Sequence, residues 1–156
     1  MNIEFNVTGD EPVELPILKT FMRIDYDDAD NLLRMLARAA RGAIERYCGI
    51  SIVEKEIALT YNSMRPNFQI PYGPVKSIES ITMDDEVVDE PTDGWVRYGP
   101  GNLEMTYTAG YDPVPDELCT AIMILTEMYH DKKAVVGAVP DSVKMLIEPY
   151  NRNTFI

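Results

Sequence analysis

The stretch DDADNLLRMLARAARGAIERYCG, residues 27–49, decides the fold of this chain. Apolar side chains recur in it every three or four residues, the period that keeps them on one face of an α-helix. They are Ala29, Leu32, Leu33, Leu36, Ala40, Ala43, Ile44 and Tyr47. Acids crowd the first turn, where free N–H groups favour negative charge, and Gly49 suits the position after the last turn. The stretch predicts a long helix over residues 27–48.

A second stripe follows the same helix at the same spacing, and it is polar. Its members are Arg34, Arg38, Arg41 and Glu45. The net charge is −12, so three aligned arginines are the main concentration of positive charge. Two interpretations stay open: a solvated face paired with Asp30 and Glu45, or an inter-subunit contact with the acidic surface of a neighbour. DNA binding is disfavoured because it needs more clustered Lys and Arg.

Three shorter helices are predicted outward from this one. Apolar spacing places them at residues 16–24, 115–133 and 141–148. The second of these patterns is apolar on nearly every side between Leu118 and Leu125, which is typical of a helix buried in its own core or by neighbouring subunits.

The middle of the chain, about residues 51–112, is β-rich. Apolar and polar residues alternate over residues 54–61, 75–83 and 102–108, and a short edge strand is expected at Ile3–Val7. Strands so close together, with no helical pattern between them, imply antiparallel pairing. The predicted class is therefore α+β: a bundle of about four helices with an inserted antiparallel β module. We expect one domain over residues 1–150.

The segment after Pro149 predicts an extended C-terminal arm at residues 151–156. Proline ends the last helix, and large apolar side chains then flank a polar stretch. Candidate contacts with a partner are Tyr150, Arg152, Phe155 and Ile156. The alternative is that this segment folds back onto its own core.

Residues suited to catalysis or metal binding do not form a recognisable constellation. Acid clusters such as Asp84, Asp85 and Glu86 lie in predicted turns, where solvated carboxylates are common. The lone histidine, His130, has no partner residue to activate. Cys48 and Cys119 lack metal-ligand spacing and suit reduced thiols. We predict no catalytic residue, no metal and no cofactor. No apolar run is long enough for a membrane span and no signal peptide is recognisable, so we expect a soluble protein made in the cytoplasm.

Four segments, in this order, resemble the head–tail connector (adaptor) family of tailed bacteriophages and prophages. The first is Leu15–Asp25, which ends in the phrase Phe-Met-Arg-Ile-Asp; the second is the long helix with its closing Cys48-Gly49. The third, and the most specific, is Tyr107-Thr108-Ala109-Gly110-Tyr111, followed by Val114-Pro115 and an apolar helix. The fourth is Leu146–Arg152, where Asn151 separates Tyr150 from Arg152, a departure from the family's Pro-Tyr-Arg phrase. The resemblance covers residues 13–152 and is weakest in the β-rich middle.

The resemblance implies a structural subunit and not an enzyme. Family members form a homo-oligomeric ring of about a dozen copies in the virion neck, assembled in the bacterial host cytoplasm. The ring docks on the portal protein and receives a stopper or tail-completion protein, while DNA passes through without specific binding. An isolated subunit is compatible with a monomer, because high net charge opposes self-association.

Two alternatives stay open beside this expectation. One is another phage neck or tail-completion subunit with a similar helical frame. The other, from a different class, is a soluble acidic binding module such as a DNA-mimic inhibitor, although a mimic needs carboxylates in a phosphate-like row and these are scattered. A small enzyme would need a pocket of convergent polar groups, for which the sequence offers no candidate set.

Overall fold

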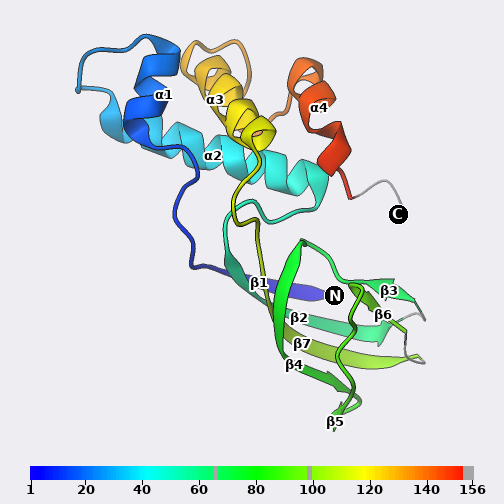
Figure 1. Ribbon diagram of the computed structural model, residues 1–156. Helices are drawn as coiled ribbons and strands as arrows, with labels where there is room; N and C mark the ends of the chain where they lie inside the picture. Colours follow the sequence, from blue (N-terminus) through cyan, green and yellow to red (C-terminus); the bar gives the residue numbers. More distant parts are fainter. Residues whose placement is uncertain (65–66, 98–99, 153–156) are drawn as a thin grey trace. The chain divides into compact units, whose positions relative to one another are not determined.

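The chain forms a mixed α+β fold, which confirms the predicted class (Figure 1). The computed structural model describes residues 1–64, 67–97 and 100–152. These divide into two compact units. The strand unit comprises Met1–Asp10 with Val53–Tyr111, and the helical unit comprises Glu11–Ile52 with Asp112–Ile156. The expected single domain over residues 1–150, with its arm at 151–156, stays a prediction.

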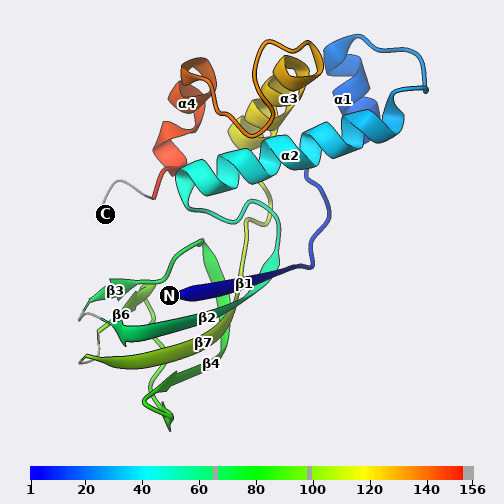
Figure 2. The ribbon, with the colours of Figure 1, turned by 180° about the vertical axis from the view of Figure 1, so that it is seen from behind.

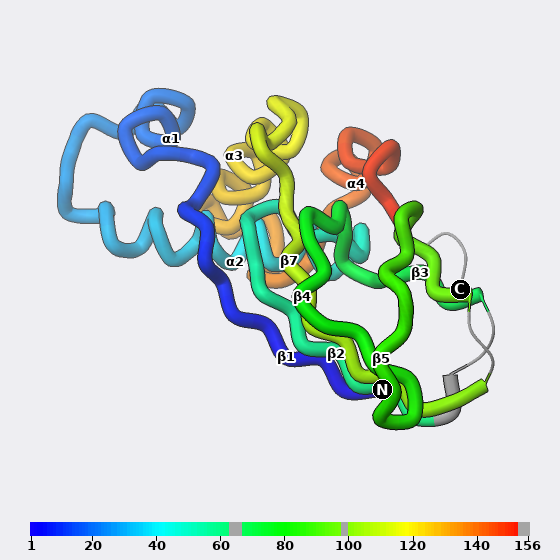
Figure 3. The backbone as a smooth tube through the Cα atoms, turned by 60° about the horizontal axis from the view of Figure 1, so that its bottom comes forward, coloured from blue at the N-terminus to red at the C-terminus, as the bar shows by residue number. Residues whose placement is uncertain are grey.

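The strand unit is built on a five-stranded antiparallel sheet in the order β1-β2-β7-β4-β5. Figure 3 traces its long strands side by side. The bounds are β1 Asn2–Val7, β2 Lys55–Met64, β4 Val75–Met83, β5 Glu86–Val87 and β7 Gly101–Ala109. A separate antiparallel pair joins β3 Phe68–Gln69 to β6 Trp95–Val96. The predicted strands at residues 3–7, 54–61, 75–83 and 102–108 are confirmed, and β1 is an edge strand as expected.

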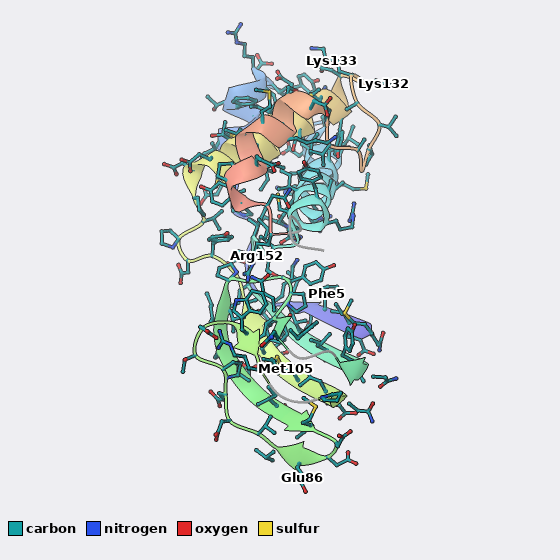
Figure 4. All side chains as sticks on the ribbon, turned by 90° about the vertical axis from the view of Figure 1, so that its right-hand side faces the viewer. Phe5, Glu86, Met105, Lys132, Lys133 and Arg152 are labelled. Carbon is teal, nitrogen blue, oxygen red and sulfur yellow. The ribbon has the colours of Figure 1, made fainter. Side chains whose placement is uncertain are left out.

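The core of the strand unit comes from alternate residues of the long strands. Its buried members are Ile57, Leu59, Ile70, Ile81, Val96, Leu103, Met105, Tyr107 and Ala109. Met105, labelled in Figure 4, lies on β7, the strand that pairs with both β2 and β4. Phe5 on β1 packs edge-on against Tyr72, with ring centroids 5.0 Å apart. A central strand buried between two partners explains why residues 101–109 alternate so regularly.

The Tyr107–Tyr111 phrase has a structural explanation within this unit. The hydroxyl of buried Tyr107 donates to the carbonyl of Pro71 at 2.7 Å. Gly110 has φ of 148° and lies so close to Glu54 that a Cβ atom would come within 2.8 Å of the Glu54 Cα. Any side chain at position 110 would therefore collide with backbone, and only glycine combines that φ with that approach.

Replacing Gly110 with Ala should lower the free energy of unfolding of the strand unit by about 1–3 kcal/mol, the cost of a strained backbone conformation. The steric overlap of the new Cβ with the Glu54 backbone should add to this loss. The matched control is Gly94→Ala, which also has positive φ (75°) but has nothing within 4 Å of its Cβ position. Trp95, the single tryptophan, lies in the same unit and reports its unfolding by fluorescence in urea. Equal losses in the two variants would contradict a role for the close approach.

The helical unit consists of two layers, with α2 forming one and α1, α3 and α4 the other (Figures 1 and 2). The bounds are α1 Leu15–Met22, α2 Asp30–Cys48, α3 Asp116–His130 and α4 Asp141–Ile147. Leu18, Leu33 and Ala37 form a core cluster where α1 meets α2. The buried side of α3 carries Leu118, Ala121, Ile122, Leu125, Thr126 and Tyr129. All four predicted helices are present.

Helix α2 begins at Asp30 and not at Asp27 as expected. Lys19 of α1 forms ion pairs with two of the acids that were expected to cap the helix. Its ammonium group lies 2.6 Å from the Asp27 carboxylate and 2.8 Å from that of Asp30. The hydrogen bonds to Lys19 lower the pKa of Asp27 and raise that of Lys19.

Two other helices end earlier than their patterns predicted, and both end at a left-handed residue. Arg23 (φ 57°) follows α1, and the N–H of Ile24 then bonds back to the carbonyl of Lys19 at 2.9 Å. Lys132 (φ 57°) follows α3, and the N–H of Lys133 bonds back to Met128 at 2.8 Å. These return bonds satisfy the last helical carbonyls, which stops each helix.

Pro149 was expected to end the last helix, with an extended arm from residue 151; α4 ends at Ile147, but the chain stays helical for one more turn. Glu148–Tyr150 forms a 3-10 turn, η1, directly after α4. Proline fits there because the first residues of a helical turn need no N–H partner. The backbone becomes extended at Asn151.

Candidate assembly surfaces

The acidic residues and the histidine considered for catalysis have local structural roles. Asp84 (φ 50°) and Asp85 (φ 68°) form the tight turn between β4 and β5, and the Asp84 carboxylate accepts the N–H of Asn102 at 2.9 Å. His130 is the last residue of α3 and lies 3.1 Å from the Asp131 carboxylate. Within residues 1–64, 67–97 and 100–152, no three His, Cys, Asp or Glu side chains are grouped as a metal site would require. No helix in this part of the chain could cross a membrane.

The structure separates the three arginines of the predicted stripe. Arg34 and Arg38 are exposed on α2, and both border a hollow of about 230 Å³ at the start of α1. Glu11 and Glu14 border the same hollow. Arg34 donates to Asn31 at 3.4 Å. The predicted pairing of an arginine with Asp30 does not occur in the described part of the chain, where Asp30 is paired with Lys19.

Arg41 is buried, with 8% of its surface exposed, and serves the interior of the helical unit. Its guanidinium donates through Nε and Nη2 to Glu11 at 2.8 and 2.9 Å and through Nη1 to Glu45 at 2.8 Å. Glu45 accepts the N–H of Ile52 with its other oxygen, at 2.8 Å. Burial lowers the pKa of Arg41, but the hydrogen bonds and charges of Glu11 and Glu45 outweigh it and raise that pKa. This network ties residues 11, 41, 45 and 52 together.

The outward side of α2 is partly apolar, which the sequence interpretation missed. Leu32 was expected in the core stripe, but it is 43% exposed, and Met35 is 56% exposed. With half-exposed Ala39 they form a second stripe at i, i+3 and i+7, which we call the α2 ridge. The sequence alone does not exclude Leu32 from the core, because the neighbours Leu36 and Ala37 of the same helix are both buried.

A shallow apolar groove lies between α1 and α3. Its lining consists of Pro16, Ile17, Thr20, Phe21 and Met123. Ile17 is 55% exposed and Phe21 is 38% exposed. Phe21 was counted in the apolar pattern of the first helix, whereas Leu18 is the residue of that helix that is buried in the core.

The root of the C-terminal segment is tied to the end of α2. The N–H of Arg152, labelled in Figure 4, donates to the carbonyl of Cys48 at 2.7 Å. The Tyr150 hydroxyl lies 3.0 Å from the Glu117 carboxylate, and the Tyr47 hydroxyl lies 3.3 Å from that of Glu148. Tyr150 and Arg152, two of the residues expected to contact a partner, thus make hydrogen bonds within the subunit at the start of the C-terminal segment. Phe155 and Ile156 lie outside the described residues.

The Cys48 side chain is buried where the end of α2 meets the end of α4. Its thiol lies 3.8 Å from the carbonyl of Ile147, and burial raises its pKa to about 12. Burial also raises the pKa of Cys119, which is half-buried. Both thiols are free, and neither has the low pKa of a reactive cysteine.

Exposed apolar patches such as the α2 ridge and the groove between α1 and α3 mark surfaces that interact with other molecules. The chain belongs to the head completion protein family, whose sequence model matches residues 16–140. This confirms the resemblance to head–tail connector proteins. No curated protein matches the chain.

The fold is also found in chains of gene transfer agent (GTA) particles. A chain from the virion of the native GTA particle is 20% identical and has a TM-score of 0.68, with 94% of each chain covered. A chain from the neck of the empty particle, computed with C6 symmetry, has 20% identity, a TM-score of 0.69 and 95% coverage of both chains. A chain from the neck of the native particle, computed with C12 symmetry, has 20% identity and a TM-score of 0.64, with 95% and 94% covered.

Proposed function

We propose that this chain is a structural subunit of a phage or phage-like neck, where about a dozen copies form a ring between the portal and a stopper or tail-completion protein. The observation that carries the proposal is the family match together with a fold shared, over nearly the whole chain, with neck proteins of GTA particles. One of those necks was computed with C12 symmetry and another with C6, and both are compatible with twelve copies.

The net charge of −12 supports a passive passage for DNA. Like charges repel over about a Debye length, roughly 8–10 Å at physiological salt, so an acidic lumen discourages phosphates from adhering. Arg34 and Arg38 fit a contact with the acidic surface of a neighbouring subunit. Arg41 is no longer proposed for this inter-subunit contact, because its charge is balanced by Glu11 and Glu45 of its own chain.

The C-terminal arm is the proposed contact with the portal or a neighbouring subunit. Tyr150 and Arg152 hold its start against α2 and α3, so the residues that follow begin from a fixed point. An extended segment with apolar anchors suits addition to a partner's surface. The chain itself carries out no reaction in this proposal.

The test is to locate the chain in particles. A producer strain without this gene should accumulate DNA-filled heads that lack tails, and the wild-type gene should restore finished particles. Electron microscopy of tagged particles should place the chain in a ring between the portal and the tail. Finished particles at normal yield without the gene, or a chain found only outside the particles, would refute the proposal.

A further inference from the structure

We propose that the α2 ridge of one copy packs into the α1/α3 groove of the next copy, which makes these two surfaces the two halves of the contact between ring subunits. This inference rests on the proposed function and names the residues that join its copies. Both surfaces lie within the helical unit.

The two surfaces have complementary shape. The α2 ridge presents Leu32 and Met35, which project from an exposed helix face. The groove between α1 and α3 offers an apolar lining from Ile17 and Phe21 of α1 and Met123 of α3. Single exposed apolar residues are common on soluble proteins, but clusters on two faces of one small unit mark interaction surfaces.

The charges beside the two surfaces are opposite. On α2, Arg38 follows Met35 by one turn, so a basic group borders the ridge. On α3, Glu127 follows Met123 by one turn and Asp116 precedes it by two, so carboxylates border the groove. Within the described residues, no carboxylate lies within ion-pair distance of Arg38. A chain of net charge −12 needs such local complementarity if copies are to meet.

The two surfaces face away from each other, which suits a ring. The ridge lies on the side of α2 opposite Leu33 and Ala37, which pack against Leu18 of the other layer. On α1, Ile17 and Phe21 are exposed whereas Leu18 is buried in that core cluster, and Met123 of α3 packs partly against the same cluster. A contact between two different, outward-facing surfaces is head-to-tail, and such a contact forms a ring when the rotation between neighbouring copies closes and a filament when it does not.

Disulfide trapping with the purified full chain tests the contact without any particle. Each variant carries one new cysteine, Met35→Cys or Ile17→Cys, in a Cys119→Ser background; Cys48 stays because it is buried. The control cysteine replaces Met145 on α4, which is 82% exposed and outside both surfaces. Far-UV circular dichroism checks that each variant is folded.

Under mild oxidation, an equimolar mixture of M35C and I17C should form the mixed dimer at least about tenfold faster than M145C with I17C, a preference of about 1.4 kcal/mol. Adding Arg38→Glu to M35C should lower the rate of mixed-dimer formation to that of the M145C control. A chain carrying both M35C and I17C should give a ladder of multimers. A rate no higher than that of the control, or rapid dimers of M35C with itself, would overturn the interface. Neither result would affect the location of the chain in the neck, which the particle experiment measures separately.

Discussion

Replacing Glu45 with Ala is expected to lower the free energy of unfolding of the helical unit by about 3–5 kcal/mol, the usual cost of removing one partner from a buried ion pair. The change leaves Arg41 buried with Glu11 alone and removes the acceptor of the Ile52 N–H. Since domains are typically stable by about 5–15 kcal/mol, this is a large part of the total. Urea unfolding followed by far-UV circular dichroism, which reports the helices, measures it.

Two further variants separate the contributions. Glu45→Gln keeps an oxygen that can accept the Ile52 N–H but loses the charge beside Arg41. It should therefore lower the free energy of unfolding by less than Glu45→Ala does. Arg97→Ala removes an exposed Arg–Asp pair with the same i, i+4 spacing, in which Arg97 lies 2.6 Å from Asp93, and should hardly shift the urea midpoint. If Glu45→Ala were as mild as Arg97→Ala, the Arg41 network would not hold the unit together.

Deleting residues 153–156 is expected to leave the unfolding free energy of the subunit unchanged and to reduce the yield of finished particles to background. The deletion keeps Tyr150 and the Arg152 N–H that bonds Cys48, so the root of the arm stays tied. It removes Phe155 and Ile156, each of which would contribute about 1.5–3 kcal/mol if buried in a partner. Particle yield in a complementation assay and the urea midpoint are measured on the same variant.

Substitutions within the arm provide the matched controls. Phe155→Ala with Ile156→Ala should reproduce the deletion, whereas Asn153→Ala with Thr154→Ala should retain assembly, because backbone and apolar anchors carry the contact. The longer deletion of residues 151–156 also loses the hydrogen bond to Cys48 and should cost about 0.5–1.5 kcal/mol of stability. A four-residue deletion that unfolds the subunit would assign the arm to its own core. Normal particle yield would remove it from assembly.

The sequence by itself determined the elements and their class. The 3.6-residue period of residues 27–49 specified a long helix, and the alternation in residues 75–83 and 102–108 specified strands, because each period matches one backbone geometry. The phrase Tyr107–Tyr111 also carried the family resemblance. It could do so because Gly110 and Tyr107 meet local demands of backbone and burial that few other residues satisfy.

Short strands and helix ends could not be predicted from local pattern. The two-residue strands β3, β5 and β6 are too short to show alternation, and β3 and β6 form by pairing with each other across more than twenty residues of sequence. The start of α2 depends on Lys19, and the last turn at Pro149 extends a helix that the local rule would stop. Such contacts join residues that are distant in sequence or override a local preference.

Only the tertiary structure decided which residues of a stripe are exposed. The spacing of Arg34, Arg38 and Arg41 gives no reason to expect any one of them to be buried. Arg41 is buried because Glu11, thirty positions earlier in the chain, pairs with it inside the helical unit. Leu32 and Leu33 are equally apolar, yet only Leu33 meets Leu18. Helical periodicity fixes the angle between side chains around an axis, but the elements packed against that axis fix which angles face the interior.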